Sequence, residues 1–135
     1  MTYRVLGAAL SICGLLAAGA PAAAHHSVGA EFDFDKPVEF TGVLKMAEWV
    51  NPHSLIHLEV TEPDGTKTVW MFETIARSSQ AGRSLARASQ GGLVVGQTYT
   101  LNGYAARNGK PFAFLKSIKM PDGRVITMWF GNPNG

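Results

Sequence analysis

Cysteine is almost absent from the sequence: Cys13 is the only one in 135 residues. If the leading segment that holds Cys13 is removed, the remaining chain has no thiol, which excludes disulfides and thiolate-bound metals. A chain without cysteine tolerates an oxidising compartment but does not require one. Charge is also scarce, with a formal net value of +2 that becomes +1 once Arg4 is lost. A net charge this small gives a weak electrostatic field, which argues against nucleic acid or anionic lipid as a partner.

Long apolar runs are scarce as well. One run, residues 5–20, follows Arg4 and is shorter than the ~20 residues of a transmembrane helix. Pro21 interrupts it, and three alanines then supply the small residues of a cleavage site. These features predict a secretory signal peptide over residues 1–24 and hence a periplasmic protein. About 110 residues remain, enough for one soluble domain that does not span the membrane.

Common catalytic motifs are missing too. The sequence has no G-x-S-x-G elbow, no H-E-x-x-H pair and no phosphate-binding glycine loop. We therefore expect a protein that is not an enzyme. A mononuclear copper oxidase is the weaker alternative, because a histidine-rich site with an open position can perform oxygen chemistry.

Alternating apolar and polar residues predict strands over most of the mature chain. Gly42 stands where such strands bend or bulge. Alanine and arginine recur over residues 74–90, where Thr74 could begin a helix that Gly82 weakens. The predicted strands are therefore 38–50, 54–61, 67–73, 94–106, 112–120 and 124–130, with a helix at 74–90.

This element order predicts an all-β protein with one helix, a small OB-like antiparallel barrel of five to six strands. The alternative is another small antiparallel barrel, or a sheet with a helix on one face. The domain organisation expected from it is a signal peptide at 1–24, a histidine-containing arm at 25–37, the barrel at 38–130 and a frayed tail at 131–135.

Paired histidines, His25 and His26, stand directly after the predicted cleavage site. Cleavage after Ala24 would make His25 the new N-terminus, so that its amine and ring nitrogen chelate one ion together while His26 adds another nitrogen. Cleavage after Ala22 would place His25 third from the amine, which is also a planar chelate. Such nitrogen-rich sets suit Cu(II) first and Ni(II) second. The alternative is a tail with two solvated histidines, or histidines that merely hydrogen-bond the barrel.

A second histidine pair follows in E-W-V-N-P-H-S-L-I-H. His53 comes after Pro52, which restricts its placement. His53 and His57 lie four residues apart on an extended segment, so their Cα atoms are roughly 13 Å apart and cannot share one ion. The expected metal site therefore joins His25 and His26 to His53, while His57 is a surface residue beside Glu59. The alternative for His53 is a turn histidine bonded to backbone carbonyls.

Methionine and tryptophan side chains offer a further candidate for a metal site. Trp49, Trp70, Met71, Met128 and Trp129 could build a Cu(I) site, because thioethers are soft ligands. Neighbouring residues on a strand point to opposite faces, so Trp70 and Met71 cannot both face one ion. We expect most of these side chains in the core.

The acids of E-F-D-F-D alternate with phenylalanines and share one face of an extended segment. They are Glu31, Asp33 and Asp35. A solvated edge is the favoured interpretation, and a carboxylate ligand for the nearby histidines is the alternative.

The chain resembles a family of small exported bacterial proteins, a domain of unknown function, that open with H-H-S and carry W-x-N-P-H. The matching positions are His25-His26-Ser27, Thr41-Gly42, Glu48 to His53, Trp70, Glu73, Gly96 and Pro121 to Val125. The chain departs where the family has a Gly-Trp pair and a K-P-G-D turn, with Arg87-Ala88 and Val94 to Gln97 instead. The resemblance implies export and a small β-barrel.

Within the matching set, four residues are candidates for a ligand-binding face or for supporting the metal ligands: Trp49, Asn51, Trp70 and Glu73. The function expected from the sequence is an exported copper carrier or sequestering protein that uses His25, His26 and His53, with a periplasmic protein as a potential partner. The alternative is a non-catalytic module that binds a small molecule or a protein, in which the histidines are incidental.

Overall fold

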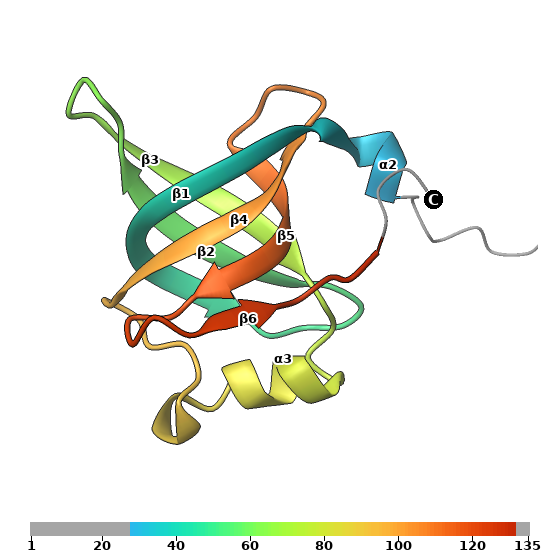
Figure 1. Ribbon diagram of the computed structural model, residues 1–135, viewed down its shortest axis with the longest axis vertical. Helices are drawn as coiled ribbons and strands as arrows, with labels where there is room; N and C mark the ends of the chain where they lie inside the picture. Colours follow the sequence, from blue (N-terminus) through green and yellow to red (C-terminus); the bar gives the residue numbers. More distant parts are fainter. Residues whose placement is uncertain (1–27, 132–135) are drawn as a thin grey trace, which may run out of the picture.

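The computed structural model describes residues 28–131, and His25 and His26 lie outside the described residues. Within residues 28–131 the fold has six strands, two short α-helices and one 3-10 helix (Figure 1). In chain order they are α2 (Val28–Glu31), β1 (Phe32–Glu48), β2 (Ser54–Thr61), β3 (Lys67–Thr74), α3 (Gln80–Leu85), η1 (Ala88–Gln90), β4 (Thr98–Ala106), β5 (Phe112–Lys119) and β6 (Val125–Thr127).

The strands close into a barrel. The sheet runs β3-β2-β1-β4-β5-β6, and a parallel pairing of β3 with β5 joins five of these strands into a ring. Long β1 makes this closure possible, because its first part pairs with β4 and its second part with β2. In Figure 1, β1 curves around the barrel and α3 lies across the lower end. The predicted all-β barrel with a helix between the third and fourth strands is confirmed.

The first strand begins earlier than the sequence predicted, inside the segment expected to be an arm. Phe32 pairs with Ala106 of β4, and Phe32 is almost fully buried. The alternation of phenylalanine with acids in E-F-D-F-D is thus the pattern of a half-buried strand. Only the residues before Phe32 precede the barrel.

The helix is shorter than predicted. Thr74 does not begin it but ends β3, where it pairs with Ser54 and is buried. Ser79 is the N-cap instead, since its side chain accepts a hydrogen bond from the backbone N–H of Gly82. Pairing with β2 thus takes Thr74, the first residue of the predicted helix, into the sheet instead.

Two hydrophobic clusters, an aliphatic inner one and an aromatic outer one, hold the barrel together. The inner one fills the barrel with residues from every long strand and from α3, including Leu44, Ile56, Leu58, Phe72, Leu85, Leu101, Leu115 and Ile118. The outer one joins the start of β1 to the C-terminal segment, where Phe34 and Trp129 stack at 5.4 Å between ring centroids. The two ends of the described chain are therefore fastened to the same outer surface.

Gly42 is not part of the β-bulge in β1. It allows β1 and β2 to approach each other closely. The β1–β2 register shifts between Leu44 and Met46, whereas a Cβ on Gly42 would collide with the carbonyl oxygen of Glu59 on β2. We expect Gly42→Ala to destabilise the fold by about 1–3 kcal/mol, because overpacking forces the strands apart. Urea denaturation measures this loss. Gly29→Ala is the control, since its Cβ would meet only ordinary contacts; equal stabilities of the two variants would contradict the assignment.

Candidate functional site

The strongest candidate site is the pair formed by His53 and Glu73. His53 precedes β2, and Glu73 lies near the end of β3, where it pairs with Leu55. Nδ1 of His53 is 2.5 Å from Oε1 of Glu73. The His53 side chain is 45% exposed and that of Glu73 only 15%. A partly buried carboxylate therefore holds one nitrogen of a ring that remains open to solvent.

Contacts with the segment after β3 fix the loop that carries His53. The backbone N–H of Arg77 donates to the carbonyl of Val50 at 3.1 Å, and Ser54 Oγ donates to the same carbonyl. Asn51 Oδ1 accepts from the backbone N–H of Ser78 at 3.2 Å. The side chain of Asn51 thus connects the loop before β2 to the loop after β3. The Asn51–Pro52 peptide bond in the first of these loops is cis.

The electrostatics of the pair extend to the N-terminal helix. Burial raises the pKa of Glu73, and the negative charge of Glu31 raises it further, while His53 acts in the opposite direction. Glu31 is the last residue of α2. A charge of α2, at the start of the described residues, therefore acts on the carboxylate of the His53–Glu73 pair.

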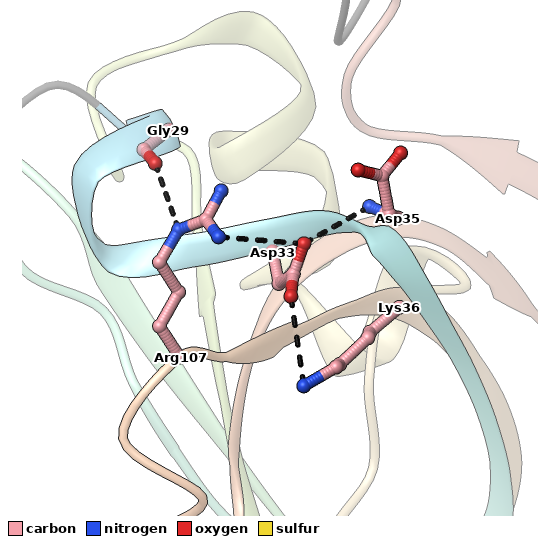
Figure 2. Close-up of polar contacts among 5 residues, drawn as sticks. All are labelled: Gly29, Asp33, Asp35, Lys36 and Arg107. Carbon is pink, nitrogen blue, oxygen red and sulfur yellow. Dashed lines mark hydrogen bonds and ion pairs between the residues drawn. The ribbon is translucent and has the colours of Figure 1, made fainter.

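A group of polar contacts around Arg107 and Asp33 connects α2 to strand β1. Figure 2 shows Arg107, directly after β4, reaching to both α2 and β1. Its Nε donates to the carbonyl of Gly29 at 3.1 Å, and its Nη1 lies 3.5 Å from Asp33. Lys36 contacts the other carboxylate oxygen of Asp33 at 3.6 Å. Arg107 thus links α2 to β1, and Asp33 forms ion pairs with two cations.

His57 forms a second histidine–carboxylate pair, but not with the acid that the sequence suggested. Its Nε2 lies 2.6 Å from Oε1 of Glu48 on β1. Glu59 is occupied elsewhere, with Lys67 and Lys45 at 3.0 and 3.5 Å. The hydrogen bond from Lys67 and the charges of both lysines lower the pKa of Glu59.

The two candidate tryptophans contribute to packing. Trp49 and Trp70 both pack against the inner cluster, and Trp70 lies 4.2 Å from Phe40 between ring centroids. The indole nitrogen of Trp70 is buried and has no hydrogen-bond partner among the described residues. Across residues 28–131, no three His, Asp or Glu side chains lie close enough together to hold a metal ion.

A separate open cleft of about 470 Å³ lies between α3 and β6. Gln80, Ser84, Arg124 and Phe130 are among its lining residues. Phe130 is 87% exposed. No local sequence pattern indicates this cleft, because it depends on how α3 packs across the end of the barrel. Glu48 was likewise missed as a partner of His57, since no local pattern links residues on different strands.

Comparison with protein families gives one match. The model of a family described as "Family of unknown function (DUF6152)" matches residues 12–115. The chain belongs to this family. The match covers most of the chain, including β1 to β4, so the resemblance to a family of unknown function is confirmed.

Other comparisons add no relative for this DUF6152 protein: neither a curated protein nor a solved structure matches it. In the described part of the chain, no helix is both long and apolar enough to cross a membrane.

Proposed function

We propose that this DUF6152 protein is an exported, periplasmic metal-binding protein that carries or sequesters copper. His25 and His26, which cleavage of the signal peptide would leave at or near the new N-terminus, would bind the ion together with His53. The observation that carries the proposal is the contact between Nδ1 of half-exposed His53 and the partly buried Glu73 carboxylate. The role is that of a carrier and not of an enzyme.

The chemistry of this pair suits a metal ligand. Metal-binding histidines commonly present one ring nitrogen to the ion and the other to a carboxylate, which fixes the ring and makes the coordinating nitrogen more basic. With Nδ1 of His53 against Glu73, Nε2 is the nitrogen left for the ion. The terminal amine and imidazoles of His25 and His26 would complete a nitrogen-rich set of the kind that Cu(II) prefers.

The path of the chain favours a shared site. Only Ser27 separates His26 from Val28, where α2 begins. The last residue of α2, Glu31, is close enough to Glu73 to raise its pKa. The described helix that follows His26 therefore acts electrostatically on the carboxylate that contacts His53, and this supports a shared site.

Two measurements test the proposal. Intact mass of the protein exported from a bacterial host should give a chain that begins at or before His25. Titration with Cu(II) should then produce a visible d–d band that His25→Ala/His26→Ala removes and His53→Ala weakens. His57→Ala is the matched control, because it removes the other carboxylate-paired histidine. A chain that starts at Ser27 or later, or unchanged binding by the double variant, would overturn the proposal.

The cleft between α3 and β6 supports the second candidate, a non-catalytic module for a small molecule or a protein partner. Arg124 and exposed Phe130 give it one cationic and one aromatic contact. A ligand there would shift the NMR signals of α3 and β6, would bind more weakly to Arg124→Ala, and would leave His53→Ala unaffected.

A further inference from the structure

Two methionines flank His57 on the outside of the barrel. Met46 of β1 lies directly opposite His57 of β2, and His57 lies directly opposite Met71 of β3. Directly paired residues of antiparallel strands point to the same face, with Cβ atoms about 4.5–5.5 Å apart. The register therefore aligns Met46, His57 and Met71 in one row across three strands.

This row faces outward. Ile56, the residue before His57, and Phe72, the residue after Met71, are both buried in the inner cluster. Because successive strand residues alternate between faces, His57 and Met71 lie on the outer surface. Met46 is 46% exposed and Met71 37%, and the His57 side chain between them is 14% exposed, so all three residues keep some contact with solvent.

The central histidine is held by a carboxylate. Nε2 of His57 contacts Glu48, so Nδ1 is the nitrogen left for another partner. Methionine has three rotatable bonds, which lets both sulfur atoms turn toward the ring between them. Outer carboxylates of this kind are a regular feature of histidine metal sites.

We propose that Met46, His57 and Met71 bind a soft monovalent cation, Cu(I) or its redox-inert analogue Ag(I). Two neutral thioethers and one neutral imidazole suit a soft ion and provide no hard oxygen donor for Mg²⁺ or Ca²⁺. This site is separate from the proposed Cu(II) site and does not depend on it, since it uses neither His53 nor the N-terminal histidines. The rival role for the row is an apolar patch that contacts another protein.

The decisive experiment follows the methionine methyl groups by NMR. In protein labelled with ¹³C at the methionine methyls, Ag(I) should shift the signals of Met46 and Met71 and saturate near one equivalent. Met120 and Met128 are buried and serve as internal controls whose signals should stay in place. Unmoved Met46 and Met71 signals, or equal shifts of all four methionines, would overturn the proposal and leave the apolar patch as the role of the row.

Variants separate this site from the Cu(II) site. Met46→Leu and Met71→Leu each keep an apolar side chain of similar size, and each should weaken Ag(I) binding at least tenfold. Glu48→Gln should weaken it by about 10- to 100-fold, the usual effect of losing an outer carboxylate. Met46→Leu/Met71→Leu should retain the Cu(II) d–d band, and His53→Ala should retain the Ag(I) shifts of Met46 and Met71. Unchanged Ag(I) affinity in Met46→Leu/Met71→Leu would rule out the thioether site, whatever the result with Cu(II).

Discussion

Replacing Glu73 with glutamine is expected to lower Cu(II) affinity by about 10- to 100-fold, the usual effect of losing a carboxylate behind a metal-bound histidine. Glutamine keeps the shape of the side chain and can still accept a hydrogen bond from Nδ1 of His53. It cannot supply the negative charge that makes the imidazole a stronger ligand. Copper titration monitored by the d–d band measures the change. Glu48→Gln is the matched control, because Glu48 holds His57 in the same way and should leave Cu(II) binding unchanged.

The same substitution should stabilise the metal-free protein at neutral pH. Burial raises the pKa of Glu73 above its ordinary value of 4.5, so the folded chain binds this proton more tightly than the unfolded chain does. The stabilisation is present below the unfolded pKa and is lost as pH rises through the folded pKa. At pH 7 the ionised carboxylate therefore opposes folding. Glu73→Gln should raise the Tm at pH 7, with the gain disappearing below about pH 4.

The two effects of Glu73→Gln have opposite signs, and this makes the test discriminating. A carboxylate that served only to stabilise the His53 loop would lower the Tm when it is lost. Loss of a carboxylate that serves binding would instead lower the copper affinity while raising the stability. A lower Tm at pH 7 together with unchanged copper affinity would assign Glu73 to the fold alone.

Local patterns predicted much of the barrel because each strand has one buried face. In β2, the alternation of Ile56, Leu58 and Val60 with polar residues fixed both the strand and its inner side. Thr74 was wrongly assigned to a helix because its strand conformation depends on pairing with Ser54, which lies on another strand. Helix propensity is a weak signal beside such pairing.

The methionine row illustrates a harder limit. Leu44 pairs with Leu58, so a regular ladder would place Lys45 opposite His57. The register shift between Leu44 and Met46 places Met46 there instead. A shift of one residue changes which side chain shares the face of His57, and no residue pattern in β1 reveals it. Similarly, the contact of His53 with Glu73 depends on the register between β2 and β3, which places the start of β2 opposite the end of β3.

Phe72→Ala is expected to cause the largest loss of stability, about 3–5 kcal/mol, as is typical when a buried phenylalanine is truncated to alanine. Phe72 is fully buried at the closure of the barrel, opposite Ile56 on β2 and Ala113 on β5. Removing its ring leaves a cavity beside the parallel β3–β5 pairing, which is the contact that makes the sheet a ring. Domains of this size have only about 5–15 kcal/mol of stability in total, so the variant should unfold at a far lower urea concentration.

The control for Phe72→Ala is Val69→Ala, on the same strand but facing solvent with 45% exposure. Such a surface change should stay within about 0.5 kcal/mol of the original stability. A loss below about 1 kcal/mol for Phe72→Ala would contradict the closed barrel, because a side chain at an open edge has less packing to lose. Glu73 directly follows Phe72, so weakening the closure should also loosen the carboxylate that positions His53. We therefore expect any folded fraction of Phe72→Ala to bind Cu(II) more weakly than the original protein, although the mutation touches no proposed ligand.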